Sequence, residues 1–220
     1  LYAVPLMLEQ EGLAREVCNY LKLEKFVPDN SKWEEMINNI RKIPKEQSVK
    51  IAIVGKYIKL EDSYISVMES IHHAGFANHV NTKIELIDSE TLNENNVKEK
   101  LQEFNGIIVP GGFGNRGTEG MITAIKYARE SNIPFLGICL GMQMAVVEFA
   151  RNVLGITDAI SAEFDENAKN PVIHIMEDQK EIDKKGGTMR LGSYPCAVKP
   201  ETLAHKVYGL DKIDERHRHR

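Results

Sequence analysis

Cysteine is scarce in this sequence of 220 residues, and the three that occur, Cys18, Cys139 and Cys196, are widely spaced and form no C-x-x-C pair. An odd, scattered set of cysteines argues against a disulfide framework and a zinc ribbon, so we expect a reducing, cytoplasmic environment and no metal site. No apolar run approaches the roughly 20 residues that a membrane-spanning helix needs. The net charge is only −4, which gives no support to a nucleic-acid or membrane partner.

The first residues, Leu1-Tyr2-Ala3-Val4-Pro5, include no initiator Met, basic segment or cleavage site, so we expect the sequence to be part of a longer chain. What is present is the composition of an ordinary globular protein, with 42% apolar and 27% charged residues. The 220 residues are enough for one full α/β domain and an appendage.

The sequence consists of two segments with different patterns of apolar residues. Residues 1–48 predict two helices, at 5–23 and 33–42, and a linker at 44–48. Residues 49–220 begin with continuously apolar strands that alternate with amphipathic helices, which predicts an α/β fold with a doubly wound, mostly parallel sheet. The predicted strands are 49–55, 83–87, 106–110 and 134–138, with weaker ones near 171–176 and 194–198, and the predicted helices are 63–77, 96–104, 118–131 and 140–154.

The segment Gly137-Ile138-Cys139-Leu140-Gly141 places a cysteine between a predicted strand and a predicted helix. Small residues two positions before and after a nucleophile allow the sharp turn known as a nucleophile elbow. Such a turn exposes the sulfur at the carboxyl ends of the strands, where open α/β sheets bind ligands, and the helix N-terminus would favour the thiolate. A buried cysteine between two structural glycines is the alternative interpretation.

A second glycine-rich segment, Pro110-Gly111-Gly112-Phe113-Gly114, directly follows the predicted strand at 106–110. Paired glycines at such a position can turn backbone N–H groups toward an oxyanion. Alone, the segment would be interpreted more simply as a glycine-rich turn. The next predicted strand leads to Cys139, however, so the two segments together favour a nucleophile beside an anion-stabilising loop.

These two segments resemble those of the class I glutamine amidotransferases, and further strings make the sequence similar to the CTP synthase family. They are Val54-Gly55-Lys56-Tyr57, Arg116-Gly117-Thr118-Glu119-Gly120, Glu148-Phe149-Ala150-Arg151-Asn152-Val153-Leu154-Gly155, Glu163-Phe164-Asp165, Gly186-Gly187-Thr188-Met189-Arg190-Leu191-Gly192 and Glu215-Arg216-His217-Arg218-His219-Arg220. The resemblance covers essentially the whole chain. It implies that residues 1–48 are the helical end of a synthetase domain with its linker, and that residues 49–220 are a C-terminally incomplete amidotransferase domain of flavodoxin-like fold.

The resemblance implies glutamine hydrolysis through Cys139, which would attack the side-chain amide, form a glutamyl thioester and release ammonia. The backbone N–H groups of Gly112 and Leu140 would form the oxyanion hole. Glu163 would suit the α-ammonium group of glutamine, and Arg220 its carboxylate. The glutamine-binding residues would be Gly112, Leu140, Gln143, Glu163 and Arg220. An extended strand at 216–220 would place alternate arginines on one face.

The resemblance also implies partners and effectors. No cofactor is expected in this domain, whereas ATP and Mg²⁺ would bind the synthetase domain of the same polypeptide, where ammonia converts UTP to CTP. GTP would be an allosteric activator, with Phe113 for stacking and Arg190 for phosphate as candidate contacts, although Phe113 is equally suited to simple packing. The full enzyme would be a homotetramer.

One feature of the family is not found. Its catalytic His and Glu stand on a His-Pro-Glu segment, and none of the seven histidines here precedes Pro-Glu. We therefore expect little steady-state glutaminase activity from residues 1–220 by themselves. Two other functions stay open. Another amidohydrolase with a cysteine elbow would differ in its preference for glutamine over other amides, and a non-catalytic assembly domain would lose assembly but not chemistry when its surface helices are changed.

Overall fold

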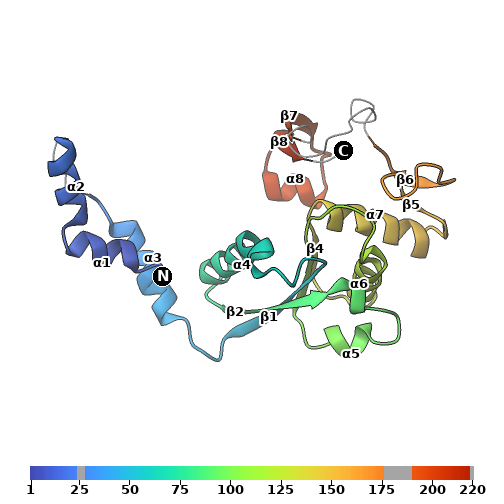
Figure 1. Ribbon diagram of the computed structural model, residues 1–220, viewed down its shortest axis with the longest axis horizontal. Helices are drawn as coiled ribbons and strands as arrows, with labels where there is room; N and C mark the ends of the chain where they lie inside the picture. The colour runs from blue at the N-terminus through green and yellow to red at the C-terminus, as the bar shows by residue number, and fades with distance from the viewer. Residues whose placement is uncertain (24–27, 176–189, 219–220) are drawn as a thin grey trace.

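The computed structural model describes residues 1–23, 28–175 and 190–218 (Figure 1). At its centre is a parallel sheet of four strands in the order β2-β1-β3-β4. The strands are β1 (Ser48–Gly55), β2 (Asn81–Asp88), β3 (Gly106–Val109) and β4 (Phe135–Gly137). This order is that of the flavodoxin-like doubly wound folds. The prediction of an α/β fold with a parallel sheet is confirmed.

Neighbouring residues of β1 point to opposite faces of the sheet, and helices cover both faces. Ala52 and Val54 pack in one cluster with residues of α5 (Val97–Leu101), α6 (Thr118–Glu130) and α7 (Leu140–Asn152). Ile53 packs in another cluster with α4 (Ile65–Ala77). Burial on both faces explains why the strands read as continuous apolar runs. Short 3₁₀ turns, η1 (Glu61–Tyr64) and η2 (Ser89–Thr91), follow β1 and β2.

Two smaller sheets complete the chain. β5 (Ile160–Ser161) pairs in parallel with β6 (Pro171–Ile173), and β7 (Arg190–Ala197) pairs antiparallel with β8 (Lys212–Arg218). Helix α8 (Leu203–Tyr208) lies between β7 and β8 in the sequence. The sequence did not predict β5 or α8, because elements this short carry too few residues to show a period.

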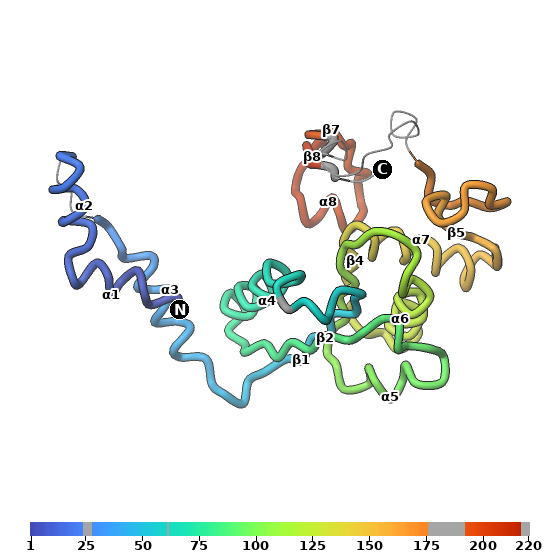
Figure 2. Tube along the Cα trace, in the orientation of Figure 1, coloured from blue at the N-terminus to red at the C-terminus, as the bar shows by residue number. Residues whose placement is uncertain are grey.

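The N-terminal helices α1 (Val4–Gln10), α2 (Leu13–Leu21) and α3 (Ser31–Lys42) extend to one side of the sheet, and residues 43–47 join them to β1 (Figure 2). The prediction of a single helix at 5–23 is wrong, because Gly12 has a φ of 83° and separates α1 from α2. Glycine adopts this left-handed conformation without steric cost. The predicted helix at 96–104 is also shorter, since α5 ends at Leu101.

A cavity of about 530 Å³ lies between α3 and α4, and residues such as Tyr2, Trp33 and Phe76 line it. The Trp33 indole N–H donates to the carbonyl oxygen of Tyr2 at 2.9 Å, and the Tyr2 hydroxyl bonds to Glu69 of α4. None of the lining residues belongs to the segments that the sequence predicts for the site.

Candidate active site

Cys139 lies in the turn between β4 and α7, and its backbone is strained. Its φ is 52° and its ψ is −104°, a combination that residues with a side chain rarely adopt. Strain of this kind at a strand-to-helix turn is the geometry of a nucleophile elbow. The predicted sharp turn at this cysteine is therefore confirmed.

The two glycines of the elbow are needed because backbone segments approach them too closely for any side chain. A Cβ atom on Gly141 would lie 1.9 Å from the carbonyl oxygen of Val109, and one on Gly137 would lie 2.6 Å from the carbonyl carbon of Gly141. The Ile138 N–H also donates to the Val109 oxygen at 2.9 Å. The elbow thus sits directly on the end of β3, which places Cys139 at the carboxyl edge of the sheet.

The surroundings of the Cys139 sulfur favour the neutral thiol. Burial raises the pKa of Cys139, and the Glu163 carboxylate raises it further. A hydrogen bond from the Leu140 N–H lowers the pKa, but the net shift is upward. The N–H at the helix N-terminus acts in the predicted direction and favours the thiolate, but burial and Glu163 outweigh it. Burial removes water that would stabilise the thiolate. One N–H group and the helix end stabilise the thiolate by less than this loss. A base that removes the thiol proton would therefore assist attack at neutral pH.

The glycine-rich loop at residues 111–114 lies against the elbow. A Cβ atom on Gly111 would be 3.4 Å from the Cβ of Cys139, and one on Gly112 would be 3.3 Å from the Cδ2 of Leu140. Within the described part of the chain, the Gly112 N–H donates no hydrogen bond. The Leu140 N–H is directed at the sulfur. The Leu140 N–H at the sulfur and the Gly112 N–H in the adjacent loop are therefore candidate donors for stabilising an oxyanion.

Two side chains that sequence reasoning did not assign to the site hold this loop, and a third holds the backbone of those two residues. Lys56, which follows β1 and is only 4% exposed, donates from Nζ to the carbonyl oxygens of Phe113 at 2.9 Å and Gly114 at 2.6 Å. The Tyr57 hydroxyl accepts from the Phe113 N–H at 3.3 Å. The Tyr64 hydroxyl accepts from the N–H groups of Lys56 and Tyr57 at 3.1 and 3.2 Å. A lysine directly after a buried strand was the available signal, because that edge of the sheet faces the ligand crevice.

Glu163 follows β5 and brings a carboxylate to the site. Its N–H donates to the Ser161 hydroxyl at 3.2 Å. Its Oε1 atom is buried and accepts no hydrogen bond from any described residue. The charge acts on the Cys139 thiol, whose pKa it raises, and on the Lys56 ammonium group, which it stabilises. A buried carboxylate oxygen without a partner is costly, so this position suits an incoming cationic group.

A family model described as glutamine amidotransferase class-I matches residues 59–220. The chain belongs to this family. The matched residues include the elbow, the glycine-rich loop and Glu163.

Curated relatives of this amidotransferase chain include the CTP synthases of Clostridium acetobutylicum, Ruminiclostridium cellulolyticum and Bacillus subtilis, which are 54%, 55% and 49% identical over 220 residues. Each match covers 100% of this chain and 41% of the relative, so the chain spans about two fifths of the relatives' length. A solved structure described as the Trypanosoma brucei CTPS glutaminase domain with bound acivicin is similar at a TM-score of 0.70. It is 40% identical, and the match covers 78% of this chain and 67% of that chain.

For the other residues expected in the amidotransferase site, the structure gives the position of the backbone or the exposure of the side chain. Gln143 is half-buried in the first turn of α7, and Phe113 is 43% exposed beside the elbow. The backbone of Arg190 pairs with Arg218 in the β7–β8 ladder, so residues 216–218 have the extended conformation that the alternation of arginines supposes. Arg220, the Arg190 side chain and residues 186–189 of the family string that begins at Gly186 lie outside the described residues.

Within the described ranges, no hydrogen bond joins a histidine to Cys139, and His72, His73 and His205 pair with Thr82, Tyr2 and Asp211 instead. No group of three His, Cys, Asp or Glu side chains in those ranges is placed to hold a metal ion. No described helix combines the length and apolar character needed to cross a bilayer.

Proposed function

We propose that this chain hydrolyses glutamine and that Cys139 is the nucleophile. The observation that carries the proposal is the unpartnered, buried Oε1 of Glu163, whose carboxylate is close enough to the strained elbow cysteine to raise its pKa. A substrate that fills this arrangement needs a carbonyl group at one end and a cation at the other. Glutamine meets both needs, because its side-chain amide would lie at Cys139 and its α-ammonium group at Glu163.

The reaction proceeds in two steps. The Cys139 sulfur forms a bond to the amide carbon, and the oxygen takes up negative charge that the Gly112 and Leu140 N–H groups stabilise. The C–N bond then breaks, and ammonia leaves with a proton supplied by a general acid. Water hydrolyses the thioester to glutamate and restores the thiol. Because the pKa of Cys139 is raised, a general base would assist attack, and the family resemblance assigns that role to a His-Pro-Glu segment.

In a protein of the relatives' length, we propose that the ammonia aminates UTP to CTP. The CTP synthase names of the relatives support this proposal, and so does the change from a helical segment to an α/β segment at Ser48. Residues 1–48 would then be the end of the synthetase domain and its linker, and residues 49–220 the amidotransferase domain. ATP and Mg²⁺ would bind the synthetase domain, and GTP would act near Phe113 and Arg190 in a homo-oligomer. Arg220 would bind the glutamine carboxylate.

The test is the Glu163→Ala variant of the protein expressed from its complete reading frame, with ammonia release from glutamine as the readout. Loss of one charge-assisted contact to an ionised group costs about 1.5–3 kcal/mol, so we expect kcat/KM to fall by about 10- to 150-fold. Glu166→Ala is the matched control, because Glu166 is an exposed carboxylate three positions further along the same segment.

Two results would contradict the proposal. If the unchanged protein releases ammonia from no amide, or from other amides as readily as from glutamine, glutamine hydrolysis is not its function. If Glu163→Ala behaves like Glu166→Ala, the protein does not bind the substrate through this carboxylate.

A further inference from the structure

We infer that Lys56 is a positioning residue that holds residues 111–114 in the conformation needed to stabilise the oxyanion, an inference that rests on the proposed glutamine hydrolysis. Lys56 stands on the turn after β1, whereas Cys139 stands on the turn after β4. The loop between them follows β3, the strand that pairs with both.

The contacts of Lys56 are with the loop itself. Its Nζ atom donates to the Phe113 and Gly114 carbonyl oxygens, and its Cε atom lies 3.2 Å from the position that a Cβ on Gly112 would occupy. The ammonium group therefore fixes the direction of two consecutive carbonyls, and its methylene chain supports the glycine beside them. Because glycine-rich backbone has many accessible conformations, a loop without these contacts would lose the fixed direction of its N–H groups.

The choice of partners separates this role from simple charge balance. Within the described ranges, no carboxylate lies within ion-pair distance of Lys56, and Arg116 pairs with Glu90 instead. Burial and Arg116 lower the pKa of Lys56, whereas the Glu163 and Glu90 carboxylates raise it. A lysine retained only to neutralise Glu163 would contact that carboxylate. Lys56 instead donates its side-chain hydrogen bonds to the loop, and Glu163 Oε1 has no partner among the described residues.

The rest of the turn supports the same arrangement. The Arg116 guanidinium donates from Nη2 to the Lys56 carbonyl oxygen at 3.0 Å, and Tyr64 accepts the Lys56 N–H. The Tyr57 hydroxyl accepts the Phe113 N–H, whereas the N–H groups of Gly111, Gly112 and Gly114 donate to no described residue. The backbone of Lys56 is thus held from both sides, which gives its side chain a fixed starting point for reaching the loop.

The experiment compares Lys56→Met with Lys59→Met in the protein expressed from its complete reading frame. Both changes remove an ammonium group from the same turn, but Lys59 is exposed. Removal of an oxyanion donor lowers kcat by about 10²–10³, so misplacement of the loop by Lys56→Met should lower kcat for glutamine by about 10- to 100-fold. The KM should change little, because Glu163 still binds the substrate. Lys59→Met should leave both constants unchanged.

Two further variants keep the test independent of folding. Lys56→Arg retains a cation that can donate to both carbonyls, and its kcat should lie between those of Lys56→Met and the unchanged protein. Tyr57→Phe removes only the hydroxyl that accepts the Phe113 N–H, and it should also lower kcat more than it changes KM. If Lys56→Met or Tyr57→Phe retains a native thermal transition and shows unchanged kcat, or raises KM alone, the positioning role is wrong. Activity of the unchanged protein toward glutamine separates this failure from failure of the proposed function.

Discussion

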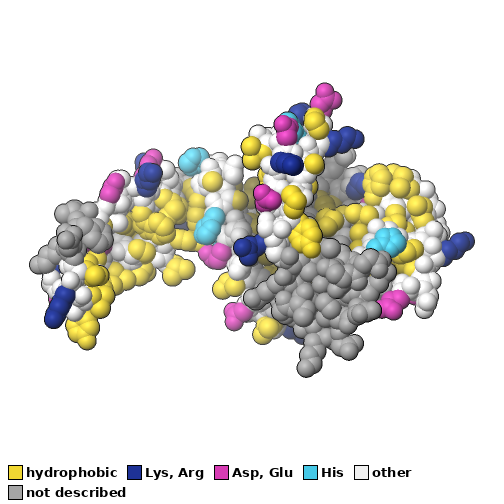
Figure 3. All heavy atoms as spheres, turned by 90° about the horizontal axis from the view of Figure 1, so that it is seen from above, with side chains coloured by type: hydrophobic (Ala, Val, Ile, Leu, Met, Phe, Trp, Pro, Cys, Tyr) yellow, Lys and Arg dark blue, Asp and Glu magenta, His cyan; other side chains and the backbone are white. Residues whose placement is uncertain are grey.

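Helices α2 and α6 are both amphipathic, yet only α6 lies in a core. Buried residues of α6 include Met121, Ala124 and Ala128, whereas α1 and α2 contain no buried residue. Figure 3 shows apolar side chains on the surface of the N-terminal helices, where Leu13 and Leu21 are among the exposed residues. The difference is the sheet, which covers α6 and α7. An amphipathic pattern therefore predicts a helix and its apolar face, but not whether another element covers that face.

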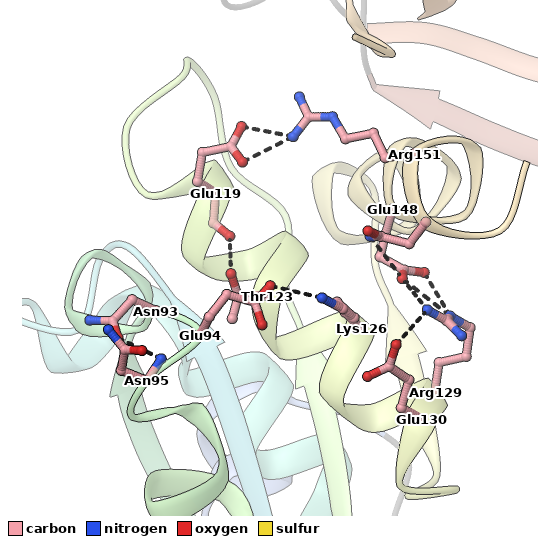
Figure 4. Close-up of polar contacts among 11 residues, drawn as sticks. Asn93, Glu94, Asn95, Glu119, Thr123, Lys126, Arg129, Glu130, Glu148 and Arg151 are labelled. Carbon is pink, nitrogen blue, oxygen red and sulfur yellow. Dashed lines mark hydrogen bonds and ion pairs between the residues drawn. The ribbon is translucent and has the colours of Figure 1, made fainter. Parts of the chain in front are cut away.

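The ion pairs of the two regions differ in the same way. Arg129 of α6 reaches Glu148 of α7 with an Nη2–Oε1 distance of 2.8 Å, and only 2% of the Glu148 side chain is exposed (Figure 4). Asn152 donates to the same carboxylate oxygen at 3.2 Å. In α2, Arg15 and Glu16 are 3.5 Å apart, and about two thirds of each side chain is exposed, at 68% and 66%. The comparison can be tested directly, because the two pairs contain the same chemical groups.

The largest effect is expected at Gly141. The Gly141→Ala variant must separate α7 from β3, because its Cβ would lie 1.9 Å from the Val109 oxygen. We expect it to destabilise the domain by at least about 4 kcal/mol, in the range reserved for severe steric conflicts. Leu21→Ala in α2 should change stability by less than about 0.5 kcal/mol, as is usual for exposed positions. Urea unfolding measures both, and an unchanged midpoint for Gly141→Ala would refute the close approach.

A smaller effect is expected for the buried ion pair. Arg129→Ala leaves the Glu148 carboxylate buried with Asn152 as its remaining partner. Removal of one partner of a buried pair costs about 3–5 kcal/mol, and we expect about 3 because Asn152 remains. Arg15→Ala should cost less than about 0.5 kcal/mol, because its partner stays in water. Equal losses in urea unfolding would show that burial does not distinguish the two pairs.

The smallest effect concerns the thiols of the two regions, Cys139 at the elbow and Cys18 in α2. Because the pKa of Cys139 is raised, its thiolate fraction at neutral pH is reduced, and its alkylation by iodoacetamide should keep increasing at alkaline pH. Burial is the main cause and Glu163 a lesser one, so Glu163→Gln should lower the pKa and move the midpoint of the alkylation profile to lower pH. Peptide mass spectrometry follows both thiols in one digest, with Cys18 as the internal reference. A Cys139 profile that does not respond to Glu163→Gln would place the carboxylate too far away to act.

Much of the fold and part of the site were predictable because they depend on local patterns. Continuous apolar strands alternating with helices predicted the parallel sheet, and glycines two residues on either side of Cys139 predicted its turn. The break at Gly12 was missed, because a glycine within an amphipathic pattern is compatible with both one helix and two. Lys56 was missed as well, since its partners at 113–114 are more than 50 residues away in the sequence.

The sequence by itself determined the strands and helices of the central sheet, the sharp turn at Cys139 and the family to which the chain belongs, because each rests on residue types at short spacing. Only the tertiary structure decided the protonation preference of Cys139, the exposure of α1 and α2 and the unpartnered oxygen of Glu163. These properties depend on which distant groups come within a few ångströms and how much water they displace. Burial and nearby charge act through space, so they cannot be predicted from a local pattern of residues.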